Sequence, residues 1–225
     1  MEKNNYLSLE EISQNYPFIL IDTCSLFTSN GKYEPSDIPI SEKLKNVKKE
    51  SKALKTFISF IKKDFPIYIT RGIKEESFKN SHYSYKSSIK RLDFPLQKDY
   101  ISKEHHRKLV EIHRGIRESI RTRNKIKELL EEKNRIFSPE QNELLVYKKL
   151  KSENFHLKNE CGLSKVDFDF LISGLTLTYE RDPVALISND SGINNAWQNL
   201  LSREGIPRDC LGFFMRKDLN LYLEK

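Results

Sequence analysis

Phe18-Ile19-Leu20-Ile21-Asp22 decides the fold, because four apolar residues stand in a row and end on an acid. A short apolar run without polar alternation is typical of a strand that is buried on both faces, as in a parallel sheet. Pro66 to Ile69 and Val184 to Ile187 share this pattern, and Leu211 to Met215 fits a late edge strand. The sequence therefore predicts a central parallel β-sheet.

Sequence with helical periodicity separates these predicted strands. Leu44 to Lys63 lies between the first two runs, and Val166 to Tyr179 precedes the third. Strands that alternate with helices predict an α/β domain in which helices flank the sheet. Trp197 and the pair Phe213-Phe214 are expected in its core. We interpret residues 1–225 as a single domain.

Residues 80–161 differ from the rest, because they are charged, follow the helical period and contain no convincing buried strand. Ser102 to Arg135 carries eleven Lys or Arg against six Glu, with a break at Asn134 to Pro139 and a further helix at Glu140 to Ser152. Its apolar stripe consists of Leu109, Ile112, Ile116, Ile120, Ile126 and Leu130. We predict a helical, basic insertion that either clamps a nucleic-acid strand or scaffolds a partner protein.

The composition favours a nucleic-acid partner in a reducing compartment. The net charge of +7 attracts polyanions, although a composition rich in Lys gives the same charge. Cys24, Cys161 and Cys210 lie far apart, which argues against a disulfide framework and a structural zinc site. The first residues do not fit the pattern of a secretory signal, so we expect none, and no apolar run approaches roughly 20 residues. We expect a cytoplasmic protein without membrane contact.

Acidic residues follow the predicted strands at the edge where parallel sheets bind ligands. These acids are Asp22 after the first strand, Glu75 and Glu76 after the second, Asp190 after the third, and Asp167 and Asp169 at the start of the helix before the third. Clustered carboxylates repel one another unless a cation lies between them, and Mg²⁺ and Mn²⁺ favour oxygen ligands. All five histidines fall in the helical middle. The pattern therefore predicts metal-assisted hydrolysis of a phosphodiester.

Four blocks of this sequence resemble the PIN-domain family and follow the family's order. They are Phe18 to Cys24, Ile69 to Glu76, Leu163 to Leu175 and Leu186 to Asp190. The resemblance implies a PIN-like fold and a ribonuclease that uses one or two Mg²⁺ or Mn²⁺ ions and leaves a 5′-phosphate and a 3′-hydroxyl. The spacing of the second block favours Glu76 over Glu75. The long stretch between Glu76 and Asp169 departs from small toxin-type members of the family.

We therefore expect Asp22, Glu76, Asp169 and Asp190 as metal ligands, with Asp167 as a further catalytic candidate. Asp167 has a structural alternative, because Ser164-Lys165-Val166-Asp167 fits an acidic variant of the capping box. Asp167 and Asp169 lie about 200° apart around a helix, so they face different sides.

Several other side chains carry two interpretations each. Thr23 and Ser188 either hydrogen-bond a metal-bound water or only close turns, and Cys24 fits a small buried residue better than a nucleophile. The basic face either contacts substrate or is a solvated surface; its residues are Arg114, Arg117, Arg121 and Lys125.

The sequence thus predicts a metal-dependent endoribonuclease that acts on single-stranded or structured RNA. The alternative is a non-catalytic nucleic-acid-binding or scaffold protein on the same fold. A small-molecule phosphohydrolase is disfavoured, because a nucleophilic Asp-x-Asp is expected after the first strand and position 24 is Cys. The RNA target, a partner or inhibitor protein and the oligomeric state are left open.

Overall fold

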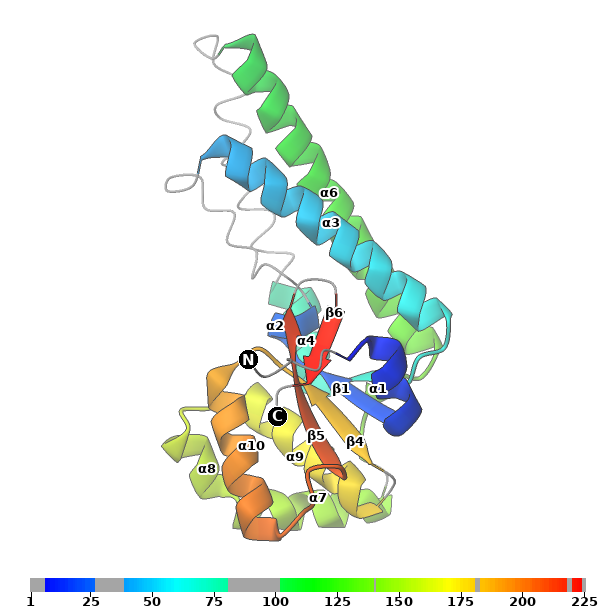
Figure 1. Ribbon diagram of the computed structural model, residues 1–225, viewed down its shortest axis with the longest axis vertical. Helices are drawn as coiled ribbons and strands as arrows, with labels where there is room; N and C mark the ends of the chain where they lie inside the picture. Colours follow the sequence, from blue (N-terminus) through cyan, green and yellow to red (C-terminus); the bar gives the residue numbers. More distant parts are fainter. Residues whose placement is uncertain are drawn as a thin grey trace, which may run out of the picture.

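The structure, a computed structural model, describes residues 7–26, 39–80, 102–139, 141–180, 183–217 and 220–223 (Figure 1). Its elements in chain order are α1 (Leu9–Asn15), β1 (Phe18–Ile21), α2 (Thr23–Leu26), α3 (Ile40–Lys62), β2 (Ile67–Thr70), α4 (Arg71–Glu75), the π-helix η1 (Glu76–Asn80), α6 (Lys103–Glu132), β3 (Ile136–Phe137), α7 (Gln141–Glu153), α8 (Phe155–Glu160), α9 (Lys165–Glu180), β4 (Val184–Ile187), α10 (Ser191–Glu204), β5 (Leu211–Lys217) and β6 (Asn220–Leu223). The α/β class predicted from the sequence is confirmed.

The strands form one sheet in the order β3-β2-β1-β4-β5-β6. The first five are parallel, and β6 pairs antiparallel with β5. Strand β1 lies at the centre, where Leu20 pairs with Tyr68 of β2 on one side and with Leu186 of β4 on the other. All four residues of β4 are buried, as expected for a strand with neighbours on both sides and helices on both faces.

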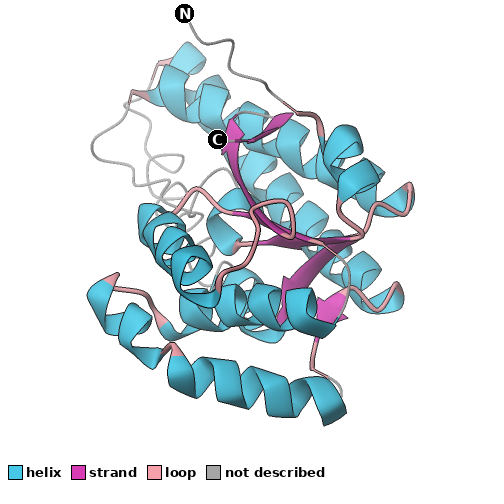
Figure 2. Cartoon of the chain, turned by 60° about the horizontal axis from the view of Figure 1, so that its bottom comes forward, coloured by secondary structure: helices cyan, strands magenta, loops and turns pink. Residues whose placement is uncertain are grey.

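Helices cover both faces of this sheet (Figure 2). The chain passes from β1 to β2 through α3 and from β2 to β3 through α6, and then from β4 to β5 through α10 in the opposite direction. Because such crossovers are right-handed, α3 and α6 lie on one face and α10 lies on the other. In agreement, α3 packs on α6, and α10 packs on α9. The direction changes between β1 and β4, which is the topological switch point of the sheet.

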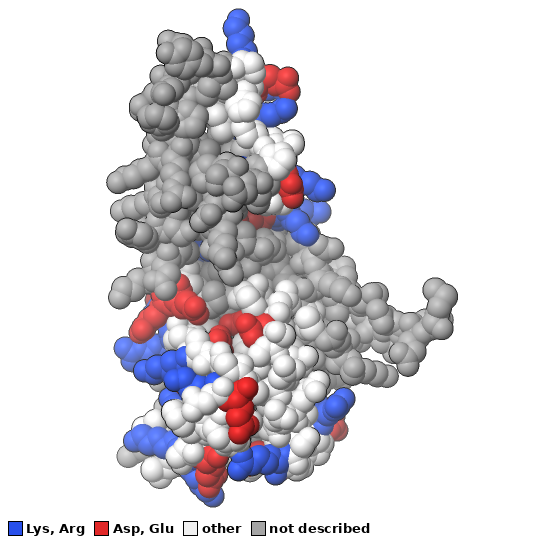
Figure 3. All heavy atoms as spheres, turned by 90° about the vertical axis from the view of Figure 1, so that its left-hand side faces the viewer, with Lys and Arg blue, Asp and Glu red and all other residues white. Residues whose placement is uncertain are grey.

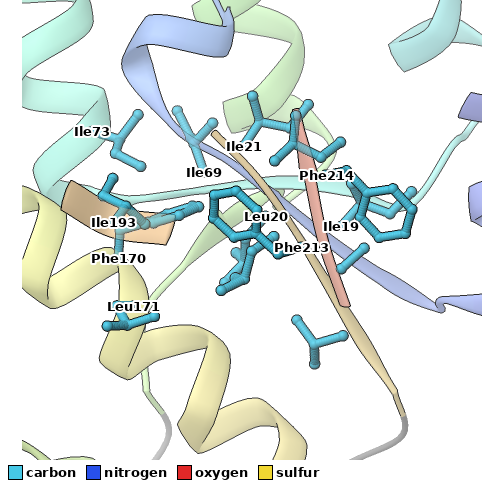
Figure 4. Close-up of a cluster of buried hydrophobic side chains, with 14 of the residues drawn as sticks. Ile19, Leu20, Ile21, Ile69, Ile73, Phe170, Leu171, Ile193, Phe213 and Phe214 are labelled. Carbon is cyan, nitrogen blue, oxygen red and sulfur yellow. The ribbon is translucent and has the colours of Figure 1, made fainter. Parts of the chain in front are cut away.

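The main core lies between the sheet and its helices (Figure 4). Ile19 and Leu20 of β1 are fully buried beside Phe170 of α9 and Phe214 of β5. The predicted core positions of Trp197, Phe213 and Phe214 are confirmed. Helix α9 lies directly on β4 at Gly174, where an added Cβ would meet Leu186 Cδ2 at 2.5 Å.

Helices α3 and α6 lie side by side and project from the sheet as an arm (Figure 1). They run in the same direction, because the ion pairs Lys48–Glu111 and Lys55–Glu118 advance together along both helices. A small core of Val47, Leu109, Ile112 and Ile116 holds them together. The predicted apolar stripe of α6 is confirmed: Leu109, Ile112, Ile116, Ile126 and Leu130 are buried, and Ile120 is half-buried.

One expectation about strands was wrong, and one strand was not expected. Residues 80–161 contain no fully buried strand, but they include the two-residue, half-buried β3, which pairs with the outer side of β2 at Ile69 and Thr70. Asn134, with φ of 52°, turns the chain out of α6 and into this strand. Strand β5 is not the edge of the sheet, because β6 pairs with it on the outside. Within the described ranges, no helix is long and apolar enough to cross a bilayer.

Candidate functional site

Asp22 stands directly after β1 and is buried, with 3% of its surface exposed. Its backbone N–H donates to the carbonyl of Ile187, which continues the pairing of β1 with β4 by one residue. Its carboxylate Oδ2 accepts hydrogen bonds from the Ser188 hydroxyl at 3.0 Å and from the Cys24 thiol at 2.7 Å. The carboxylate is therefore withdrawn from bulk water and held in one orientation.

Ser188 connects Asp22 to Asp190. The buried Ser188 Oγ donates to Asp22 and accepts from the backbone N–H of Asp190 at 3.1 Å. These two bonds place the Asp190 nitrogen no more than about 6 Å from Asp22 Oδ2. The two acids follow β1 and β4, so both lie at the switch point, where open α/β sheets bind ligands.

Asp190 is also the N-cap of α10. Its Oδ1 accepts from the backbone N–H groups of Gly192 at 2.7 Å and Ile193 at 3.1 Å. Both bonds use the same oxygen, and within the described part of the chain Oδ2 accepts no hydrogen bond. Since the residue is exposed, the carboxylate is anchored on one oxygen and presents the other to solvent.

Cys24 supports the Asp22 carboxylate as a neutral thiol. Burial, together with the negative charge of Asp22 and the hydrogen bond to it, raises the pKa of Cys24 to about 12. The thiol therefore stays protonated at neutral pH, and it donates to Asp22 while its sulfur accepts from the backbone N–H of Asn189 at 3.3 Å. A thiol of such high pKa is a poor nucleophile, in agreement with the sequence interpretation.

The second strand brings Glu75 and Glu76 to the same edge. Thr70 caps α4 by accepting from the Ile73 N–H at 3.3 Å. Glu75 is exposed and pairs with Arg71 one turn earlier at 3.3 Å. Glu76 is half-buried and is the first residue of the π-helix η1. Such π-helical turns are rare in proteins, and those that occur often lie at functional sites. Of the two, Glu76 is the better candidate.

The two acids of α9 have different surroundings. Asp167 forms the capping box, because its carboxylate accepts from the Ser164 N–H and its own N–H donates to the Ser164 hydroxyl, both at 3.1 Å. Asp169 is half-buried and accepts from the Tyr147 hydroxyl at 2.9 Å and from Lys151 Nζ at 2.5 Å. The ammonium of Lys151 therefore supplies the positive charge beside Asp169.

The hydrogen bonds of this network keep Lys151 and Tyr147 in their usual charge states. Burial works to lower the pKa of Lys151, but the hydrogen bonds to Asp169 and Tyr147 outweigh it and raise the pKa. Burial and the charge of Asp169 raise the pKa of Tyr147 to about 12. Lys151 thus remains an ammonium ion and Tyr147 a neutral donor. Neither residue was predicted from the sequence. Their spacing of four indicates that both lie on one side of α7, but it does not indicate that this side packs against α9.

The segments that carry the predicted acids converge. A Cβ at Gly72 of α4 would lie 3.4 Å from Val166 of α9, and one at Gly192 of α10 would lie 3.0 Å from the carbonyl of Cys161. The start of α9 therefore lies between the starts of α4 and α10. Even so, among the residues that the structure describes, no three His, Cys, Asp or Glu side chains are close enough to hold a metal ion together.

Among the described residues, the pair of Asp22 and Asp190 fits a divalent ion best. Mg²⁺ usually keeps several waters and binds one or two carboxylates together with substrate phosphates, and not a closed cage of side chains. Asp22 and Asp190, connected through Ser188, match that requirement. Asp169 accepts from Lys151, and Asp167 accepts from the Ser164 N–H, so both carboxylates already have protein partners.

The remaining predicted residues lie elsewhere. Arg114, Arg117, Arg121 and Lys125 are exposed on α6. Thr23 begins α2, but its side chain is outside what the structure describes, as is all of His82. The other histidines lie on α6 and α8, away from the strand ends.

Comparisons with known proteins add no relative to this picture. No protein-family model, curated protein or solved structure matches the chain. The interpretation of the site therefore depends on its geometry and on the sequence.

Proposed function

We propose that this chain is a metal-dependent nuclease of the PIN type. Its proposed activity is that of an endoribonuclease, which hydrolyses RNA at the sheet edge where β1 and β4 end. One observation carries the proposal. Two aspartates leave adjacent central strands at the switch point, and one buried serine hydroxyl connects them. Two carboxylates at this place, with no histidine among the strand-end residues, favour metal-assisted attack on a phosphodiester over nucleophilic catalysis.

The residues of the site would have distinct roles. Asp22 and Asp190 would hold a Mg²⁺ or Mn²⁺ ion, Asp22 through a fixed buried carboxylate and Asp190 through its solvent-facing Oδ2. When bound, such an ion activates a water and neutralises charge on the phosphate. Ser188 and Cys24 would orient Asp22 by donating to its Oδ2. Glu76 is the acid on the neighbouring strand end that would orient a water.

The alternative is a nucleic-acid-binding protein without catalytic activity, and one observation favours it. Asp169 is neutralised by Lys151, so the third acid of the expected set is already paired. A site with two available carboxylates holds an ion less tightly than a site with four. The two proposals make opposite statements about cleavage.

The test is cleavage of a labelled single-stranded RNA by the wild-type chain, Asp22→Asn and Asp190→Asn, in Mg²⁺, Mn²⁺ or EDTA. We expect each substitution to lower the rate by about 100-fold or more, the usual cost of removing an electrostatic catalytic group. Glu75→Gln is the matched control, because Glu75 is exposed and paired with Arg71. A labelled DNA of the same sequence separates ribonuclease from general nuclease activity.

Two results would overturn the proposed metal-dependent nuclease activity. Wild-type cleavage that persists in EDTA would exclude a metal-dependent mechanism. Absence of cleavage across both metals and both nucleic acids, with binding retained, would establish the non-catalytic alternative. Circular dichroism of each variant shows whether its fold is intact.

A further inference from the structure

Helix α6 carries exposed cations that form no ion pair with the acids that the structure describes. Arg114, Arg117, Arg121 and Lys125 are exposed, and within the described ranges none of the four forms an ion pair. Other cations nearby are paired, as Lys48 is with Glu111 and Lys108 with Glu104.

These cations form one line along the helix. At 100° per residue, Arg114, Arg117, Arg121 and Lys125 fall within an arc of about 80°. Lys103 and Arg107 are also exposed and fall within the same arc. We call these six residues the cationic row: Lys103, Arg107, Arg114, Arg117, Arg121 and Lys125. The row spans about 33 Å of the helix axis.

The cationic row faces away from the helix that α6 packs on. Ile112, Ile116 and Leu130 are buried on the opposite side of α6, where α3 lies. Glu128 and Glu132 occupy the row's arc in the last turn, so the positive charge ends at Lys125. Figure 3 shows basic and acidic side chains together on the described part of the arm that faces the viewer.

We propose that the cationic row binds the phosphates of a single nucleic-acid strand laid along the arm. Most neighbouring cations are separated by about 5 to 6 Å along the axis, and they form one line, which suits one line of phosphates and not the two lines of a duplex. The row contains no aromatic side chain on which a base stacks, so binding is independent of base sequence.

The strand would lead toward the candidate active site. Lys74 of α4 pairs with Glu131 of α6 at 2.6 Å, two residues before Glu76. Glu131 lies about 9 Å along the helix from Lys125. The inner end of the row therefore lies beside the segment that carries Glu76. This inference depends on the proposed function only for the use of the strand as a substrate, since binding is measured without cleavage.

The test is fluorescence anisotropy with an unstructured 20-nucleotide RNA in EDTA, at salt concentrations from 50 to 200 mM. The row variant combines Arg114→Gln, Arg117→Gln, Arg121→Gln and Lys125→Gln. The matched control removes four exposed cations outside the row: Lys62→Gln, Lys148→Gln, Lys149→Gln and Arg208→Gln. Both variants lose the same net charge, so any difference between them reports the position of the charge.

The salt dependence gives the expected magnitudes. Six phosphate contacts on a single strand predict that wild-type affinity falls by about 300-fold between 50 and 200 mM salt. Two remaining contacts predict a fall of about 7-fold for the row variant. The control variant should retain the wild-type salt dependence. Because all four substituted side chains are exposed, we expect an unchanged circular dichroism spectrum.

Three outcomes would overturn this inference: equal losses in the row and control variants, an unchanged salt dependence in the row variant, or tighter binding of a duplex of the same length. Failure of the proposed nuclease function is distinguishable from failure of this inference. In the first case cleavage would be absent, while binding that depends on the cationic row would remain.

Discussion

The contact between Gly115 and Val47 makes a sharp prediction about the arm. A Cβ added at Gly115 of α6 would lie 2.1 Å from Val47 Cγ1 of α3, whereas carbon atoms in contact prefer about 3.5 to 4.0 Å. Val47 is stiff within a helix, so the methyl group cannot turn away freely. Overpacking of this kind costs about 1–3 kcal/mol. Replacing glycine by alanine within a helix returns about 1 kcal/mol.

The effect of Gly115→Ala on the free energy of unfolding should therefore have opposite signs in the wild-type and Val47→Ala chains. In the wild-type chain we expect it to lower the free energy of unfolding by up to about 2 kcal/mol. In a Val47→Ala chain the clashing methyl group is absent, and the same substitution should raise that free energy by about 1 kcal/mol. Urea unfolding followed by circular dichroism at 222 nm measures all four chains. Gly72→Ala is the control, since its Cβ would have ordinary contact with Val166 at 3.4 Å.

The reasoning is refuted if Gly115→Ala has the same effect in both backgrounds, within about 0.5 kcal/mol, since additivity is the mark of residues that do not touch. A stabilising effect in the wild-type chain would contradict it equally. Loss of the arm's packing should also weaken the binding attributed to the cationic row, which requires a straight and rigid α6.

Three further predictions concern the site. The pKa values of Cys24, Tyr147 and Lys151 are all raised, so above about pH 9 the native protein binds more protons than the unfolded chain. The urea concentration at the unfolding midpoint should therefore fall as the pH rises from 9 to 11. A constant or rising midpoint would contradict the environments described for these three side chains. With a pKa of about 12 against an ordinary 9.0, Cys24 should contain about 1000-fold less thiolate at pH 8 than an unperturbed thiol, and it should therefore react much more slowly with iodoacetamide. Rapid labelling detected by mass spectrometry would contradict the contact of this thiol with Asp22. Ser164→Ala removes one hydrogen bond of the capping box, so it should lower the free energy of unfolding by about 1 kcal/mol. The substitution should leave the affinity for Mn²⁺ unchanged. A large loss of Mn²⁺ affinity would show that this turn contributes to the metal site.

The buried strands could be predicted from the sequence because their physical signal is local. Phe18–Ile21 and Val184–Ile187 have the predicted bounds, since an uninterrupted apolar run has few alternatives to a strand that is covered on both faces. The apolar stripe of α6 was equally clear, because helical periodicity over 30 residues is a strong signal. Strand β3 has two residues, which is too short for any pattern.

The arrangement of the charged groups could not be predicted, because it depends on tertiary contacts. Arg123 is one of the eleven basic residues between Ser102 and Arg135, yet it is buried and pairs with the buried Glu50 of α3. Asp169 meets Lys151 only because α7 packs on α9. Ser188 could not be assigned to a turn or to a carboxylate until the pairing of β1 with β4 placed it beside Asp22.

The capping box shows the opposite case. Ser164 and Asp167 are three residues apart, so the reciprocal bonds follow from local helix geometry and were predicted as the structural alternative for Asp167. Local signals thus identified the buried central strands and the capping box of α9. They did not determine the tertiary contacts of the acidic side chains.

The central claim is that Asp22 and Asp190 bind one divalent ion at the switch point of the sheet. A crystal grown with Mn²⁺ and examined by anomalous scattering tests it directly. We predict a Mn²⁺ peak about 2 Å from an oxygen of each carboxylate, and loss of that peak in Asp22→Asn. A bound ion that contacts neither aspartate, or a peak that survives unchanged in Asp22→Asn, would contradict the claim.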